Sequence, residues 1–277
     1  MIQSIDPKNL SVNDLQTILQ NSIAPRPIAF ASTIDNDGNP NLSPFSFFNI
    51  FSSNPPVLIF SPARKGEQGE LKDTYLNVKE IPEVVINMVN FEMVEQMSLA
   101  SVAYVRGIDE FKKSGFTPLA SELVRPFRVK ESPVQFECDV QQIIELGSEA
   151  GAGNLIICLI KRIHLNSAIL DVNGNIDPLK TDLVGRMGGS YYIRTIKKAL
   201  FQIPKPIASI AMGIDVIPDH IKNSKYLTGN ELARLGGLEK MPIANLEKGQ
   251  IPTKIDFKKA KILIKEGKII EAFGHLY

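Results

Sequence analysis

The stretch RPIAFASTIDNDGNPNLSPFSFFN, residues 26–49, decides the fold class of this chain. Over residues 28–35, heavy side chains such as Ile28 and Phe30 alternate with small ones, which is the period-two pattern of a β-strand with one bulky face. The pair Asp37-Gly38 then indicates a tight connection. A second strand is expected over residues 42–49, so the stretch predicts a β-hairpin.

The hairpin also has the features of a surface that accepts a flat ligand. Small and hydroxyl side chains stand where one face would otherwise be filled, and they let a planar ring approach the backbone. Exposed N–H and C=O groups at a strand edge can then pair with a ring that has its own donors and acceptors. Pro44 removes one donor and is expected to interrupt the regular ladder at that point.

Outside the hairpin, β patterns dominate the chain as far as residue 165, and helical patterns become commoner after it. Further strands are expected at residues 57–61, 84–88, 134–146 and 155–165. Helices are expected after Ser11 and at residues 71–78, 91–99 (capped by Asn90), 109–113, 228–235 and 256–265. We therefore predict a mainly β fold, an antiparallel β-barrel with inserted helices over residues 1–200. A partly helical C-terminal extension, residues 201–277, follows a linker with Pro204 and Pro206.

Composition excludes several classes of function. The chain has 277 residues, with 31 Lys and Arg against 30 Asp and Glu, so no general field of charge recruits nucleic acid or anionic lipid. The two cysteines, Cys138 and Cys158, lie in apolar segments, where neither a disulfide framework nor a zinc site is expected. No apolar run reaches the roughly 20 residues of a membrane helix, and the start lacks a secretory signal, so a cytoplasmic protein is expected.

The sequence also lacks the common catalytic motifs. Neither a Gly-x-x-x-x-Gly-Lys-Ser/Thr phosphate loop nor a dinucleotide-binding Gly-x-Gly-x-x-Gly turn is present. The histidines His164, His220 and His275 are isolated from one another, so no metal site is expected, and His164 is interpreted as a packed or edge side chain of a β run. We nominate no catalytic residue, and an enzyme built on this chain would take its reactivity from a cofactor.

A second segment is suited to a phosphate group. It contributes Ser61, Arg64, Lys65, Lys72 and Thr74 close to the start of a predicted helix. Cations, hydroxyls and a helix N-terminus within one short segment are the groups that bind phosphate in proteins. Taken alone, however, the segment is better explained as a charged surface loop followed by an ordinary amphipathic helix.

Taken in order, these segments resemble the flavin-reductase-like, FMN-binding split-barrel family. The resemblance is carried by Arg26-Pro27-Ile28, Ser32-Thr33, Gly38, NLSPFSFFN at 41–49, Pro55-Pro56, Arg64, Lys72-Asp73-Thr74 and Asn77. It continues through EFKKSG at 110–115, ESPV at 131–134, Glu137-Cys138 and GRMGGSYY at 185–192. Each piece alone is weak, but the ordered set, which covers roughly residues 20–195, is a strong signal.

The resemblance implies a homodimer of six-stranded antiparallel split β-barrels, with FMN at the subunit interface. Carried over by position, the residues that face the isoalloxazine ring and ribityl chain would be Thr33, Ser46, Phe47, Phe48 and Asn49. The contacts to the ribityl chain and phosphate would come from Asn49, Ser61, Arg64, Lys72 and Thr74. Arg186 and Tyr191 would close the pocket, although Tyr191 and Tyr192 are equally well explained as core aromatics.

The activity that the resemblance implies is an NAD(P)H-dependent flavin oxidoreductase, in which the nicotinamide stacks on the flavin and passes a hydride to flavin N5. Electrons would continue to a small-molecule acceptor (free flavin, oxygen or iron) or to a partner oxygenase. One alternative is an FMN-dependent oxygenase or reductase of a specific small molecule, with its pocket shaped by residues 100–133 and the tail. Another is a non-catalytic flavin-binding or redox-sensing protein. No nucleic-acid or membrane partner is expected.

Overall fold

The computed structural model describes residues 2–65, 68–203, 210–242 and 255–276. The chain divides into two compact units, Met1–Leu200 and Phe201–Tyr277, and each is described by itself.

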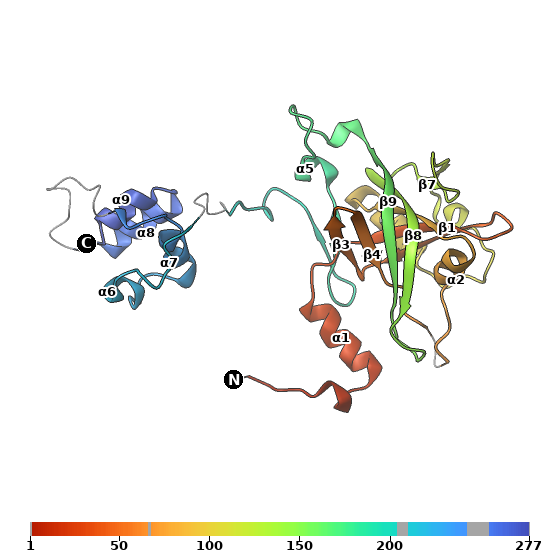
Figure 1. The fold of residues 1–277 in the computed structure, drawn as a ribbon, viewed down its shortest axis with the longest axis horizontal. Helices are drawn as coiled ribbons and strands as arrows, with labels where there is room; N and C mark the ends of the chain where they lie inside the picture. The colour runs from red at the N-terminus through yellow and green to blue at the C-terminus, as the bar shows by residue number, and fades with distance from the viewer. Residues whose placement is uncertain (1, 66–67, 204–209, 243–254, 277) are drawn as a thin grey trace. The chain divides into compact units, whose positions relative to one another are not determined.

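The first unit is built on one antiparallel sheet, which has seven strands in the part of the chain that the structure describes (Figure 1). The strands are β1 (Ala29–Ile34), β2 (Pro40–Phe45), β3 (Phe48–Ser53), β4 (Pro56–Phe60), β5 (Glu83–Met88), β8 (Val134–Glu145) and β9 (Asn154–Leu165). Their order across the sheet is β2-β1-β5-β8-β9-β4-β3. The fold is therefore mainly β, as the sequence predicts.

The two outer strands of this sheet are neighbours in the chain. β2 ends at Phe45 and β3 begins at Phe48, so only Ser46 and Phe47 connect opposite edges of the sheet. Because the three residue steps from Phe45 to Phe48 span no more than about 11 Å, the edges must approach each other and the sheet must curve round into a barrel. The prediction of one strand over residues 42–49 is wrong, and this break accounts for seven strands in place of six.

The turn between β1 and β2 forms as the sequence predicts. Ile34 pairs with Pro40, and the side chain of Asp35 accepts hydrogen bonds from the backbone N–H groups of Asp37 (3.0 Å) and Asn39 (2.8 Å). Pro44 does not interrupt the ladder, because it pairs with Phe30 in an outer strand, where a proline is tolerated.

Strand β1 is buried on both faces. Ala29 and Ala31 pack with Phe60, Ile86 and other residues of one core cluster, while Phe30 belongs to a second cluster that lies under the helices. The small side chains of β1 are thus fully enclosed by protein atoms. The expectation that they leave a face open to a flat ligand is wrong, because the sheet packs on both sides of this strand.

The other elements of the first unit are short helices and strands. They are η1 (Pro7–Asn9), α1 (Val12–Ser22), α2 (Asp73–Glu80), η2 (Phe91–Met93), α3 (Val94–Leu99), α4 (Glu110–Ser114), β6 (Pro118–Leu119), β7 (Arg128–Val129), η3 (Ser167–Ile169), α5 (Pro178–Thr181), β10 (Val184–Arg186) and β11 (Tyr192–Arg194). Ser11 caps α1 through a 3.1 Å bond from the N–H of Asp14. Asn90 precedes η2 but makes no capping bond with its side chain, contrary to expectation.

The second unit is helical and has its own core. Its helices are α6 (Asp219–Lys222), α7 (Gly229–Gly236), α8 (Phe257–Lys265) and α9 (Ile269–Gly274). Ile221, Leu235 and Phe273 are among its buried residues, and Thr228 and Glu231 form the capping box that begins α7. Pro204 and Pro206, the predicted linker residues, lie outside the described residues. Among the residues described, no helix has the length and apolar character needed to cross a membrane.

Candidate functional site

A single backbone hydrogen bond brings the two predicted halves of the site together. The N–H of Ser61 donates to the carbonyl of Phe47 (2.8 Å), and Phe48 pairs with Phe60 in the β3–β4 ladder. The segment expected to face a ring therefore lies directly beside the segment expected to bind a phosphate. Both lie at the connection between the outer strands.

The ring-facing segment presents apolar side chains on an edge strand. Phe47 is exposed, and Phe48 is half-buried and packs against the core cluster that contains Phe60. Asn49 is exposed and its side-chain oxygen accepts a 2.8 Å bond from the N–H of Ile50. Ile50 and Phe51 follow, with 60% and 63% of their surface exposed. This strip suits a planar aromatic ligand or a protein surface.

The loop after β4 is fastened to the β8–β9 turn. The N–H of Arg64 donates to the carbonyl of Ala152 (2.9 Å), and the N–H of Gly151 donates to the carbonyl of Arg64 (3.0 Å). The Arg64 guanidinium donates to the carbonyl of Gly147 (3.1 Å) and to Glu145 (2.8 Å). Arg64 therefore holds the loop in shape, and most of its hydrogen-bonding capacity is already used.

Lys72 carries a charge that no ion pair neutralises among the described residues. It occupies the N-cap position of α2, where its side chain makes no capping bond, and it is half-buried. Burial lowers the pKa of the Lys72 ammonium group, the neighbouring charge of Lys65 lowers it further, and the carboxylate of Asp73 offsets part of this decrease. No hydrogen bond or ion pair of the Lys72 side chain occurs in the part of the chain that the structure describes. An ammonium group beside free N–H groups at a helix N-terminus is the arrangement that favours an anion.

Thr33 and Thr74 lie behind the site, in a buried polar network. The side-chain amide of Asn41 donates to the hydroxyls of Thr33 (3.1 Å) and Thr74 (2.9 Å), and the amide of Asn77 donates to Thr33 (3.1 Å). All four residues are buried. Their side chains therefore position the N-terminus of α2 against the β1–β2 hairpin, and their hydroxyls do not reach the surface.

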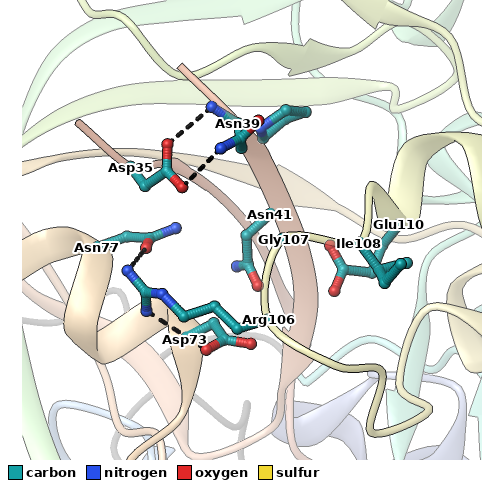
Figure 2. Close-up of a pocket in the computed structure, with 10 residues that line it drawn as sticks. Asp35, Asn39, Asn41, Asp73, Asn77, Arg106, Gly107, Ile108 and Glu110 are labelled. Atoms are coloured by element: carbon teal, nitrogen blue, oxygen red, sulfur yellow. Dashed lines mark hydrogen bonds and ion pairs between the residues drawn. The ribbon is translucent and has the colours of Figure 1, made fainter. Parts of the chain in front are cut away.

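A small polar pocket lies beside this network, and Arg106 crosses it (Figure 2). The Arg106 guanidinium lies 3.4 Å from both Asp73 and the side-chain oxygen of Asn77. The free space is about 10 Å³, which is room for roughly one water molecule. This pocket therefore cannot hold an organic ligand. Arg106 instead offsets the charge of Asp73, which lies next to Lys72.

Arg26 is a residue of the site that sequence reasoning missed. Its guanidinium donates to the hydroxyl of Ser46 (3.3 Å) and to the carbonyls of Ile23 (2.7 Å) and Met187 (2.9 Å). Its backbone pairs with that of Arg186. Arg26 thus connects the segment of residues 186–192, which we call the late loop, to the ring-facing segment. Its place in the Arg-Pro-Ile motif was the feature of the sequence that could have identified it.

The two tyrosines of the late loop are not core residues. Tyr191 is 78% exposed and Tyr192 is 37% exposed, which excludes the core alternative. The guanidinium of Arg186 lies over the ring of Tyr192, 4.8 Å from its centroid. Tyr191 therefore lies on the surface of the loop that Arg186 begins.

His164 packs against a buried acid. Its Nε2 lies 2.7 Å from a carboxylate oxygen of Glu137, which is fully buried. A cleft of about 420 Å³ lies beside it, and none of the predicted site residues lines that cleft. No group of three or more metal-binding side chains gathers anywhere in the described ranges.

Comparison with known proteins identifies the family. Residues 22–180, more than half of the chain, match the family model of the flavin reductase like domain. The chain belongs to the flavin reductase-like family. The resemblance drawn from the sequence is therefore confirmed.

Three similar proteins match this chain over almost their whole length. An uncharacterised protein of Aquifex aeolicus is 34% identical over 196 residues, which is 71% of this chain and 97% of that protein. Nitrilotriacetate monooxygenase component B from Bacillus cereus is 29% identical with a TM-score of 0.68, over 73% of this chain and 99% of that one. A Shewanella frigidimarina protein assigned to the flavin reductases with a split barrel domain is 23% identical with a TM-score of 0.61, over 71% and 94%.

These comparisons have a clear limit along the chain. The family match ends at residue 180, so the helices of the second unit lie outside it. The shared structure is the barrel, and the second unit is not accounted for by the family.

Proposed function

We propose that this protein is an FMN-binding oxidoreductase of the flavin reductase type, which takes a hydride from NAD(P)H. The observation that carries the proposal is the half-buried Lys72 at the N-terminus of α2, which forms no ion pair among the described residues. It follows the loop that begins at Ser61, and Ser61 is bonded to the backbone of the exposed Phe47. A ligand with a flat ring at one end and a phosphate at the other matches both features. FMN is such a ligand, and the family supports a flavin.

The residues that would hold FMN differ in their roles. Lys72, helped by Lys65, would contact the phosphate, and Ser61 and Asn49 would contact the ribityl chain. Arg64 would keep the loop after β4, which begins at Ser61 and which we call the phosphate loop, in place through its bonds to Glu145 and Gly147.

Towards the ring, Phe47 and the backbone of residues 46–49 would face the isoalloxazine, and Phe48 would support them from the core side. Thr33 and Thr74 would act as supports behind the site, because their hydroxyls are enclosed. Tyr191 would border it from the late loop.

The flavin supplies the redox chemistry, which is acceptance of a hydride from reduced nicotinamide. The protein's part is to hold the ring in one orientation and to leave one face accessible. Hydride transfer itself does not need a general acid or base from the protein. The electron acceptor is a small molecule or a partner oxygenase, in keeping with the Bacillus cereus relative, which is a monooxygenase component.

The proposal includes a homodimer and a cytoplasmic location. Strand β3 is an outer strand, and its exposed residues Ile50 and Phe51 continue the apolar strip begun by Phe47. A second copy of the chain that covered this strip would bury apolar surface and enclose a flavin bound beside it.

The test begins with the purified protein. The apoprotein is titrated with FMN and, separately, with riboflavin, which lacks the phosphate; NADH or NADPH is then added in air. We expect tight FMN binding, weaker riboflavin binding and oxidation of the nicotinamide. A protein that ignores FMN would contradict the proposal and both alternatives. FMN binding without oxidation would instead favour the flavin-binding module, or the enzyme of a specific small molecule.

A further inference from the structure

We infer that Arg26 and Arg186 form a second anion-binding centre, which binds an oxyanion group of the substrate that reacts with the flavin. The inference rests on the proposed function and extends it, because it assigns Arg186 to the second substrate and not to FMN. The oxyanion would be a phosphate of the nicotinamide donor or a carboxylate of the electron acceptor.

The two arginines lie directly opposite each other. The N–H of Arg26 donates to the carbonyl of Arg186 (2.9 Å), and the N–H of Arg186 donates to the carbonyl of Arg26 (2.8 Å). Residues paired in this antiparallel way carry their side chains on the same side, with Cβ atoms about 5 Å apart. Two like charges in this position repel each other. The ring of Tyr192 under the Arg186 guanidinium offsets part of this repulsion, and a bound anion would offset more of it.

Acids neutralise the other arginines of the first unit. Six of them have a carboxylate oxygen within 4.0 Å: Arg64, Arg106, Arg125, Arg128, Arg162 and Arg194. Arg26 and Arg186 have none among the described residues. The two arginines without an acid are therefore the two that face each other.

The groups that contact Arg26 do not neutralise its positive charge. Its hydrogen-bond acceptors are all neutral: the Ser46 hydroxyl and the carbonyls of Gln20, Ile23 and Met187. Burial lowers the pKa of Arg26, and the charge of Arg186 lowers it further. Arg26 is buried and acts as a positioning residue that contributes charge, whereas Arg186 is half-buried and can contact a ligand.

This centre is separate from the one at Lys72. The Arg26 guanidinium contacts the side chain of Ser46, whereas Ser61, at the start of the loop after β4, contacts the backbone carbonyl of Phe47. FMN has a single phosphate, and Lys72 and Lys65 already provide for it. Two cationic centres with separate sets of contacts therefore indicate two anionic groups, and the second must come from another molecule. Arginine is well suited to this role, since its fork of N–H groups matches phosphate and carboxylate oxygens.

The first test measures anion binding directly. FMN-saturated wild type, Arg186→Ala and the control Lys198→Ala, which removes an exposed charge from the neighbouring segment, are titrated with inorganic pyrophosphate in a calorimeter. We expect Arg186→Ala to weaken pyrophosphate binding about 10-fold or more, and Lys198→Ala to leave it unchanged. Equal binding by all three proteins would overturn the inference.

The second test identifies the source of the anion. We compare kcat/KM for NADH with that for N-benzyl-1,4-dihydronicotinamide, which has no phosphate, and likewise for a carboxylated and a neutral benzoquinone as acceptors. A selective loss for NADH in Arg186→Ala assigns the centre to the donor, and a selective loss for the carboxylated quinone assigns it to the acceptor. Unchanged ratios would overturn the inference.

FMN affinity is measured on the same proteins. If Arg186→Ala weakens FMN binding as strongly as a substitution at Lys72, the pair belongs to the flavin site and the inference is wrong. Failure of the proposed function has a different signature, because the wild type itself would then neither bind FMN nor oxidise either donor. The pyrophosphate titration is then repeated on the protein without flavin, where weaker binding by Arg186→Ala still supports the anion centre and equal binding still overturns it.

Discussion

The backbone N–H of Ser61 donates a 2.8 Å hydrogen bond to the carbonyl of Phe47. This bond connects the residue that follows β4 to the residue that precedes β3. The ring-facing segment and the phosphate loop therefore move together, and a substitution that displaces one of them is expected to displace the other.

Lys72→Met is expected to weaken FMN binding and to stabilise the apoprotein. It removes one charge-assisted contact to the phosphate, so the Kd for FMN should rise about 10- to 100-fold while the Kd for riboflavin stays nearly constant. The apoprotein should melt a few degrees higher, since a half-buried charge without a partner among the described residues is lost. Fluorescence titration and thermal unfolding measure the two effects.

Lys79→Met is the matched control, because Lys79 is exposed near the C-terminal end of the same helix. Lys79→Met should change neither the affinity for FMN nor the affinity for riboflavin. An equal loss of riboflavin and FMN affinity in Lys72→Met would contradict the phosphate assignment.

Gly153→Ala is expected to disturb the phosphate loop. An added Cβ would lie 2.7 Å from the hydroxyl oxygen of Ser61, so one of the two must shift. We expect the free energy of unfolding to fall by about 1–3 kcal/mol and FMN affinity to fall with it. Chemical denaturation and FMN titration measure both.

Removal of the Ser61 hydroxyl should relieve this contact, since the Cβ of Ser61 is 4.0 Å away. The double variant Gly153→Ala/Ser61→Ala should therefore be more stable than Gly153→Ala. If the second substitution restores no stability, the close approach of these two residues is not what the first one disturbs.

Tyr75 is expected to make stability fall at high pH. Its hydroxyl donates to Glu145, and burial, followed by that carboxylate, raises the pKa of Tyr75 to about 12. A tyrosine in the unfolded chain has a pKa near 10, so above pH 10 the unfolded state loses its proton first and is favoured. Between pH 9 and 11 the wild type should lose about 1 kcal/mol more stability than Tyr75→Phe. Urea unfolding at several pH values gives this difference, and parallel curves for the two proteins would contradict it.

Phe51→Asp is expected to dissociate the homodimer. The substitution places a charge in the apolar strip of β3, and its burial against a second copy is unfavourable, so the dimer Kd should rise about 100-fold. Val172→Asp is the control, because Val172 is a fully exposed apolar residue outside the strip. Sedimentation velocity measures both variants. A dimer that withstands Phe51→Asp would place the interface elsewhere.

Local features of the fold were predictable from the sequence. The β1–β2 turn follows from Asp37-Gly38, and the capping box of α7 follows from Thr228 and Glu231, since the residues involved are close together in the chain. The break at Ser46 and Phe47 was not predictable. Residues 42–49 are rich in apolar side chains and contain no turn motif, so they carry no information about which strand each half will join.

In the site, too, local features were predictable from the sequence and contacts between distant residues were not. The types of residue around Ser61 and Lys72 indicated a phosphate, but the roles of Arg64 and Lys72 depend on distant acids. Arg64 bonds to Glu145, 81 residues away, while Lys72 forms no ion pair among the described residues. Such pairings between distant residues decide which cation remains available to bind a phosphate. They cannot be inferred from the spacing of residues in the sequence.

The two residues between β2 and β3 couple ligand binding to the stability of the sheet. Ser46 and Phe47 are the direct chain connection between the opposite edges of the sheet. A ligand bound across them would contact both edges at once and slow their separation. Amide hydrogen exchange in β2 and β3 would then report occupancy of the site, without any measurement of colour or turnover.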